Sequence, residues 1–469
     1  MVPNVGDGRM KLNARELFFT QKRFDLIFKY IYLKYPHNDF AKKAYLENIR
    51  AFNNFYEVEP SDGIAKNTSE DFINSFEKLY RSISTNGFNE DIGTLPIGNN
   101  GEISDGAHRL AVCAFLNCEL EVVPDGRNDL YDYKFFQARK MDQDIMDYGA
   151  LEYVKLNPNA YIINLHSVAD MSKDEEVIKI LQKYGFIYYK KDISLSFNGY
   201  VNLKKLSYGS FWERESWIGT VENKFAGARD HARKSMGNDP LRVFVFVCDD
   251  INKVINLKAE IRALYDIGNY SVHINDTKEE AIWLAETYFN KNSLDMLNRR
   301  PFDYEDVQFD EMVEDLKATA EKNQIDIEDI CAAGSTPFGV FGLRKSNDLD
   351  FLYCGHTPFD IQTETLSNHD SELSYYPYSK SIIIQNPQHH FYYHGLKFIT
   401  LDICHDMKNK RHEVPKDIKD CKMIRKFQRK GLLRHFAHFK FFEKRKHGLK
   451  RTIILFGFIK LSYQKRRQS

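Results

Sequence analysis

Two acidic residues and a glycine turn lie close together in the segment 331–355, which reads CAAGSTPFGVFGLRKSNDLDFLYCG. The pattern predicts a short strand, a turn at Gly334-Ser335, a flexible connector and a second strand over 348–352. Residues two apart in a strand point to the same face, so Asp348 and Asp350 are expected to project together. Paired carboxylates repel each other unless a cation lies between them, and Mg²⁺, which takes oxygen ligands, is the natural candidate.

The turn before these acids has the features of a phosphate site. Gly334 would let a triphosphate approach the backbone, and Ser335 would donate a hydrogen bond to it. Lys345, in the connector, is a further candidate for phosphate binding. The alternative is an acidic strand end beside a glycine-rich loop, because Asp-x-Asp pairs also occur by chance in a charged chain.

This arrangement resembles the nucleotidyltransferase superfamily, whose signature is Gly-Gly or Gly-Ser followed by Asp-hydrophobic-Asp on the next strand. Here Gly334-Ser335 precedes Asp348 and Asp350, with a connector slightly longer than in the smallest members. The resemblance implies a fold with a mixed sheet, Mg²⁺ held by Asp348 and Asp350, and a nucleoside triphosphate as substrate.

The same resemblance implies a third catalytic carboxylate on a neighbouring strand. We expect a strand over 396–403, and Asp402 on it is the preferred candidate. Asp370 is the rival. A zinc site is a less favoured interpretation, because the spacing fits no standard site; its ligands would be His389, His390, His394 and His405.

A second candidate site lies within residues 95–117, where a strand and a glycine turn lead to Asp105-Gly106-Ala107-His108-Arg109. A helix is expected from about residue 110. A glycine turn, a basic pair and a helix N-terminus are ingredients of an anion site, and Arg109 would hold a phosphate with two parallel hydrogen bonds. The alternative is an ordinary turn with Arg109 in a salt bridge.

This box is similar to that of the ParB/sulfiredoxin-like superfamily, which binds nucleotide phosphates through such a motif. The resemblance assigns Asp105, Gly106, His108 and Arg109 to phosphate binding. Ala107 stands where sulfiredoxins have a reactive cysteine, so sulfiredoxin chemistry is not expected. The box looks more like that of the branch containing small-molecule kinases, in which Asp105 or Glu102 would act as the acid or base.

Two further segments carry candidate residues in the middle of the chain. His273 ends a strand predicted over 270–274 and precedes a helix N-terminus, so it is a candidate for catalysis or phosphate contact; the alternative is a histidine satisfied within the core. The segment 219–227, followed by Arg229, suits either a charged site or a solvated helix face.

Composition predicts a globular chain of several domains, because 469 residues are too many for one core. We expect an α/β and α+β multidomain protein. Its parts are a ParB/sulfiredoxin-like domain with N-terminal helices (1–147), a central α/β region of unknown role (148–300), a nucleotidyltransferase-like domain (301–425) and a basic amphipathic tail (426–469). Residues 160–165 and 241–247 have the apolar runs of buried strands, whereas 292–305 reads as a linker.

Several features predict a cytoplasmic location. The 66 basic residues balance the 66 acidic ones. The seven cysteines form no CxxC motif, which indicates a reducing compartment. No apolar run reaches the ~20 residues of a membrane span. In the tail, Leu432, Phe436 and Phe439 fall on one helical face among basic residues. This pattern suits a helix that lies against the inner face of a membrane. It also suits a helix that binds RNA or a partner protein, or one that packs on its own domain. DNA is not expected as a partner.

Chains of this general appearance occur among bacterial surface-polysaccharide proteins. The resemblances therefore imply a Mg²⁺-dependent nucleotidyltransferase that activates a small phosphorylated sugar or alcohol, with an additional kinase activity in the ParB-like domain. Two alternatives stay open: a toxin-like nucleotidyltransferase acting on protein or RNA, and a non-enzymatic ParB-like nucleotide-binding regulator.

Overall fold

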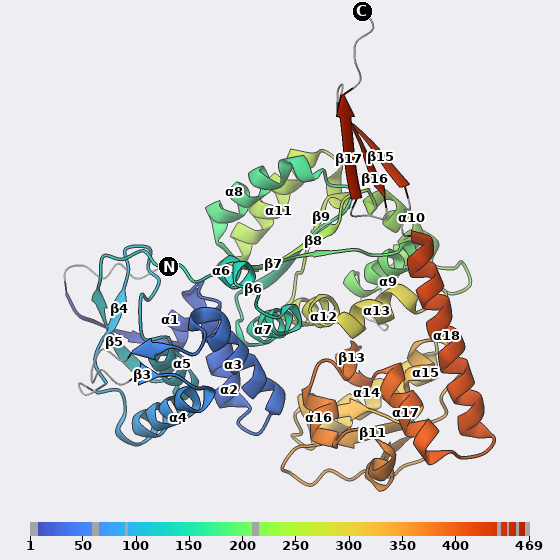
Figure 1. Cartoon of the computed structure of the whole chain (residues 1–469). Coiled ribbons are helices and arrows are strands. Elements are labelled where there is room, and N and C mark those ends of the chain that lie inside the picture. Colours follow the sequence, from blue (N-terminus) through green and yellow to red (C-terminus); the bar gives the residue numbers. More distant parts are fainter. Residues whose placement is uncertain are drawn as a thin grey trace, which may run out of the picture. The chain divides into compact units, whose positions relative to one another are not determined.

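The computed structural model describes residues 8–58, 65–89, 92–208, 215–438, 442–447, 450–455 and 459–464, with side chains through residue 429. The chain divides into two compact units, which are described separately (Figure 1). The first comprises residues 1–373 and 378–400, and the second comprises 374–377 and 401–469. The mixed α/β class predicted from the sequence is confirmed, because helices alternate with several small sheets.

The first unit begins with helices around a three-stranded sheet of order β1-β5-β4. Strand β1 is antiparallel to β5, and β4 is parallel to it. The elements are β1 (Met10–Asn13), α1 (Ala14–Thr20), α2 (Asp25–Lys34), α3 (Asp39–Asn53), β2 (Glu57–Val58), β3 (Ala65–Lys66), α4 (Ser69–Asn86), β4 (Leu95–Ile97), α5 (Ala107–Leu116), β5 (Glu119–Pro124), α6 (Tyr133–Ala138) and α7 (Gln143–Leu156).

The central region is a four-stranded antiparallel sheet of order β7-β8-β6-β9 between two helical layers. Helices α8 and α11 cover one face, and α7 and α12 cover the other (Figure 1). Every residue of β8 is buried, including Arg242, the one charged residue in its otherwise apolar run. The elements are β6 (Ala160–Leu165), α8 (Asp174–Tyr184), β7 (Phe186–Ile193), α9 (Phe197–Ser207), α10 (Ala226–Ser235), β8 (Leu241–Val247), α11 (Ile251–Tyr265), β9 (Val272–Ile274), α12 (Lys278–Tyr288) and α13 (Lys291–Arg299).

The last part of the first unit is a five-stranded mixed sheet of order β12-β11-β10-β14-β13. The β10–β14 and β11–β12 pairs are parallel, and the other two pairs are antiparallel. The elements are α14 (Val307–Lys322), β10 (Ile330–Ala332), α15 (Pro337–Val340), β11 (Leu349–Tyr353), β12 (Leu366–Asn368), α16 (Lys380–Gln385), β13 (His390–Tyr393) and β14 (Leu396–Ile399).

A partly buried ionic network ties this mixed sheet to the central helices. Lys155 of α7 pairs with Glu328 and, at 3.4 Å, with Glu286 of α12. Lys397 of β14 lies 2.8 Å from Glu328. Burial alone would raise the pKa of Glu328, but the two lysines outweigh it and hold that pKa below its usual range. The network therefore fixes the sheet against α7 and α12.

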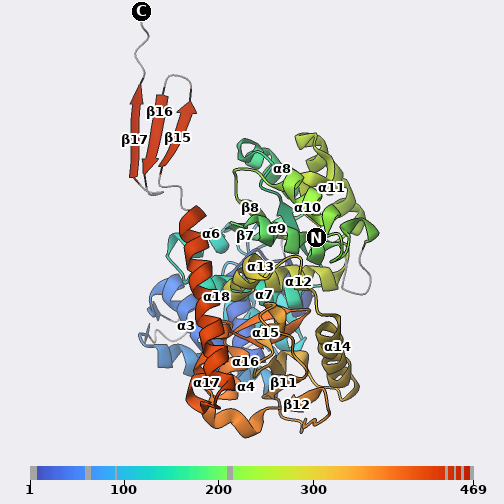
Figure 2. The same ribbon diagram turned by 90° about the vertical axis from the view of Figure 1, so that its right-hand side faces the viewer.

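The second unit contains α17 (Leu401–Arg411), α18 (Lys416–His438) and an antiparallel sheet of β15 (Phe442–His447), β16 (Lys450–Leu455) and β17 (Ile459–Gln464) (Figure 2). The predicted apolar face with Leu432, Phe436 and Phe439 lies outside the residues whose side chains are described. Within the described part of the chain, no helix combines the length and the apolar character that crossing a membrane requires.

Candidate functional site

The glycine turn and one of the two acids are in direct contact. Strand β10 ends at Ala332, the chain turns at Gly334, and β11 returns antiparallel to β10. The Ala333 N–H donates to the main-chain oxygen of Asp350 at 2.7 Å. Gly334 has φ +59°, and a Cβ there would lie 2.2 Å from Oδ2 of Asp350. Only glycine therefore leaves room for the Asp350 carboxylate at the turn.

Two side chains of the neighbouring segment hold that carboxylate. The Ser367 hydroxyl of β12, which stands opposite Asp350 in the parallel register, donates to Oδ1 at 2.9 Å. Nε2 of His369 lies 3.8 Å from Oδ2. The Asp350 side chain is still 19% exposed, so ligands can reach it. Sequence reasoning missed Ser367 and His369, because they reach Asp350 only through the pairing of β12 with β11.

Asp348 is placed differently from the prediction. Strand β11 starts at Leu349, one residue later than expected, so Asp348 lies just before the strand and is exposed. Because Asp348 is outside the strand, the alternation of side chains along a strand does not place it on the same face as Asp350. Lys345 is also exposed, and Ser335 is partly buried in the turn. The predicted flexible connector contains the short helix α15.

Asp402 does not lie on a strand, and that prediction is wrong. Strand β14 ends at Ile399, and Asp402 is in the first turn of α17 in the second unit. Its Oδ1 accepts a hydrogen bond of 2.6 Å from the Gln428 amide.

Asp370, the rival third carboxylate, belongs to the same unit as Asp350. It follows His369, whose backbone N–H donates to Phe351 of β11 at 2.8 Å. Its Oδ2 pairs with Lys380 at 2.7 Å, and its Oδ1 is buried without a hydrogen-bond partner. Of the two residues considered for the third carboxylate, Asp370 is therefore the one that the described contacts place next to β11.

The residues of the N-terminal box contact the protein itself. Helix α5 starts at Ala107, earlier than predicted, after Gly106 with φ +80°. The Arg109 guanidinium donates to the carbonyls of Ile92 and Thr94 at 3.0 and 3.1 Å and lies 3.5 Å from Asp105. Arg109 therefore ties the loop before β4 to α5.

The His108 ring points into the protein. Its Nε2 lies 3.0 Å from the Tyr45 hydroxyl, and Phe76 packs against the ring. Desolvation, with Lys29 and Lys66 nearby, holds the pKa of His108 well below its ordinary value. These contacts leave His108 in a packing role in the described structure.

Glu102 is buried beside the same turn. Its Oε2 accepts a 2.8 Å hydrogen bond from the backbone N–H of Lys22, and the side chain is 2% exposed. Burial raises the pKa of Glu102 to about 7, against the opposing effect of the Lys22 N–H. A carboxyl group with a pKa near neutrality can transfer a proton in a reaction. The hydrogen bond from Lys22 fits a structural role equally well, in which Glu102 anchors the loop.

His273, the candidate in the central region, is buried on β9. Its Nε2 lies 2.6 Å from Glu280 of α12, and Thr277 caps that helix. Burial lowers the pKa of His273 although Glu280 opposes the shift. In the segment 219–227, Lys224 and Glu222 are exposed, and Arg229 donates to the Asn223 carbonyl at 3.4 Å.

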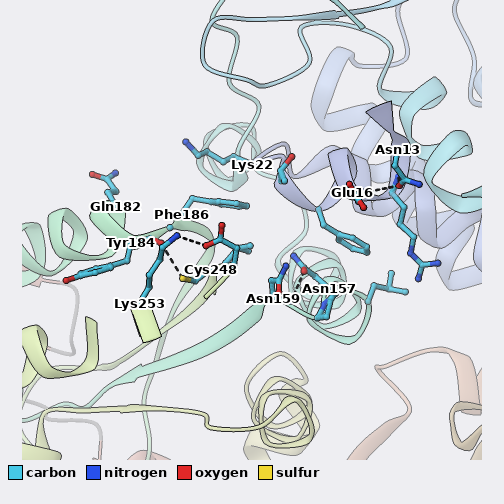
Figure 3. Close-up of a pocket in the computed structure, with 18 of the residues that line it drawn as sticks. Asn13, Glu16, Lys22, Asn157, Asn159, Gln182, Tyr184, Phe186, Cys248 and Lys253 are labelled. Carbon is cyan, nitrogen blue, oxygen red and sulfur yellow. Dashed lines mark hydrogen bonds and ion pairs between the residues drawn. The ribbon is translucent and has the colours of Figure 1, made fainter. Parts of the chain in front are cut away.

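A cavity of about 870 Å³ lies between the N-terminal and central regions, apart from Asp350 (Figure 3). It is lined by side chains of mixed charge, such as Glu16, Lys22 and Lys253. Lys253 is already paired with Asp249 at 2.7 Å. Its described lining does not include Gly334, Ser335, Asp348 or Asp350, so it is not the predicted transfer site.

The side chains near Asp350 fit a metal ion that takes most of its ligands from water and substrate. In the described part of the chain, no cluster of three or more His, Cys, Asp or Glu side chains is arranged to hold a metal ion, the four predicted zinc histidines included. Mg²⁺ does not need such a cage, because one or two carboxylates with water and substrate phosphates suffice.

Comparisons of the chain with protein-family models, curated proteins and solved structures found no match.

Proposed function

We propose that this protein is a Mg²⁺-dependent nucleotidyltransferase that acts on a small phosphorylated sugar or alcohol. The contact between Gly334 and Asp350 supports this proposal best. It places a carboxylate against the glycine of a Gly-Ser bend, where there is no Cβ. Such a bend can hold a polyphosphate, and the carboxylate beside it can hold the cation that accompanies one.

Each residue of the site has a separate task in the proposed reaction. Asp350 and Asp348 would hold Mg²⁺, which lowers the charge of the triphosphate. Ser335 and Lys345 would bind its outer phosphates. Ser367 orients Asp350 through the hydrogen bond to Oδ1. An oxygen of the acceptor phosphate then bonds to the α-phosphorus while the bond to pyrophosphate breaks, so pyrophosphate leaves.

Asp370 is the candidate for the third carboxylate, because the backbone N–H of the preceding residue, His369, donates to Phe351 of β11. We expect Asp370→Asn to lower transfer, and unchanged transfer would remove this residue from the site. We do not extend the proposal to a kinase in the N-terminal box, because Arg109 and His108 already contact carbonyls and aromatic rings there.

The test uses each of the four radiolabelled nucleoside triphosphates with Mg²⁺ and a panel of sugar and alcohol phosphates. We expect one combination to give a labelled product and pyrophosphate, and Asp350→Asn to abolish it. Asp303→Asn, at an exposed aspartate before α14, is the matched control and should keep full activity. Equal transfer by Asp350→Asn would refute the site, and label on protein or RNA would refute the proposed acceptor.

A further inference from the structure

A group of basic side chains is buried in the central region, apart from the acids at β11. Lys204 of α9 has 0% exposure, and its Nζ lies 2.7 Å from Nε2 of His166. His166 directly follows β6. His273 on β9 and His231 on α10 complete the group, and all three histidines are buried. Four separate elements therefore contribute to or flank one polar centre inside the first unit.

Burial disfavours the charged forms of these groups. Burial lowers the pKa of Lys204 and of His166 well below their ordinary values, and Lys204, His273 and His231 lower that of His166 further. Burial also lowers the pKa of His231 to about 3. Glu280 contacts the group through His273 at 2.6 Å. The other charged groups that act on these histidines are Arg242, Lys258 and Asp230.

Several polar atoms of this centre are buried without a hydrogen-bond partner. They are both polar atoms of the Asn164 amide, Nδ1 of His166 and Nε2 of His231. Asn164 stands opposite His273 in the β6–β9 register, so it belongs to the same face of the structure. A buried polar atom without a partner costs about 1–3 kcal/mol. So many on neighbouring residues indicate a bound molecule that supplies the missing partners.

An aromatic wall leads from the centre to the surface. His231 packs against Tyr208, Trp217 and Tyr270, with ring centroids 5.5, 5.3 and 4.9 Å away. Tyr208 also packs against His273 at 5.1 Å. Trp217 is 39% exposed, so this side of the centre is next to solvent. A small molecule would approach the bases along these rings.

We propose that Lys204, His166, His231, His273 and Asn164 form a binding site for a small oxyanion, as free phosphate or as the phosphoryl group of a small phosphomonoester. An anion fits because the centre offers four bases that can accept a proton and an unpaired amide donor. Among the described residues, Glu280 is the one carboxylate that contacts it. Binding restores the positive charge of the bases, so it is coupled to proton uptake. This site does not depend on the proposed nucleotidyl transfer.

Calorimetric titration of the full chain with inorganic phosphate and, separately, with phenyl phosphate tests the site. Titrations in buffers of different ionisation enthalpy report the protons that are taken up. We expect saturable binding with net proton uptake near neutral pH. Tighter binding of phenyl phosphate would assign a phosphomonoester, which the aromatic wall favours, and tighter binding of inorganic phosphate would assign the free ion.

Two neighbouring lysines give a matched pair of variants. Lys204→Met should weaken phosphate binding by at least about tenfold, since a charged hydrogen bond is lost. Lys204→Met should also raise the midpoint of unfolding, because it removes a buried amine that has no carboxylate partner among the described residues. Lys205 is almost as buried, but it pairs with Glu305 at 3.1 Å. Lys205→Met should therefore lower the midpoint and keep phosphate binding.

His231→Gln, which removes the unpartnered Nε2, is the second binding variant and should also weaken phosphate binding with less proton uptake. The site is overturned if the wild-type chain does not bind either phosphate. It is also overturned if binding occurs without proton uptake, or if Lys204→Met and His231→Gln both bind as the wild type does.

Discussion

Replacement of Gly334 by alanine tests whether the turn must admit the Asp350 carboxylate. The added Cβ would lie 2.2 Å from Oδ2 of Asp350 and 3.0 Å from its Cγ. Relief of this overlap requires the carboxylate to move by about 1 Å, and a shift of that size can lower a rate by on the order of 10²-fold. The φ of +59° adds a backbone penalty of about 1–2 kcal/mol for any L-residue with a Cβ.

Gly268→Ala separates the overlap from the backbone penalty. Gly268 has φ +60°, and nothing lies within 4 Å of a Cβ there. Both variants should therefore lose similar stability in urea unfolding, but only Gly334→Ala should lose pyrophosphate release. Full activity of Gly334→Ala, or an equal loss in Gly268→Ala, would show that the contact with Asp350 does not matter for transfer.

Two further predictions concern buried carboxyls. Because the folded pKa of Glu102 is raised from 4.5 to about 7, its stabilisation is complete below pH 4.5 and is lost as the pH rises through 7. Urea unfolding across this range should find Glu102→Gln more stable than the wild type only at the alkaline end, by roughly 3 kcal/mol. Glu328→Gln should lower the free energy of unfolding by about 3–5 kcal/mol, because Lys155 and Lys397 lose their shared partner; Glu314→Gln, at a surface pair with Lys317, should change it by less than about 1 kcal/mol.

Elements with a strong apolar period could be predicted from the sequence. The strands at 160–165 and 241–247 have the predicted bounds, because both are almost entirely buried and are apolar apart from Asn164 and Arg242. The segment 292–305 was expected to be a linker, but most of it forms α13. Only Ser293, Met296 and Leu297 are buried on that helix, so its polar composition concealed it.

Local motifs predicted the glycine turn and the acidic residue of the site. The residues from distant segments that contact that acidic residue could not be predicted. The Gly-Ser and Asp-x-Asp spacing indicated Gly334 and Asp350 correctly as neighbours. Ser367 reaches Asp350 only because β12 is parallel to β11, and strand pairing is not visible in a local pattern. Asp402 was misplaced for a related reason: its alternation with preceding residues continued past the true end of β14.

The buried centre around Lys204 was also beyond sequence reasoning, apart from His273. Its members come from segments up to about a hundred residues apart, and single histidines and lysines carry no motif. The orphan polar atoms appear only when β6, β9, α9 and α10 are packed together.

Titration of a non-hydrolysable nucleoside triphosphate into the protein, with and without Mg²⁺, tests the metal-triphosphate site at β11 most directly. We expect binding that requires Mg²⁺ and that weakens by at least about tenfold in both Asp348→Asn and Asp350→Asn, since each removes a charged ligand. Asp303→Asn should bind as the wild type does. Triphosphate binding that is independent of Mg²⁺, or that is equally tight in both acid variants, would contradict the proposed site.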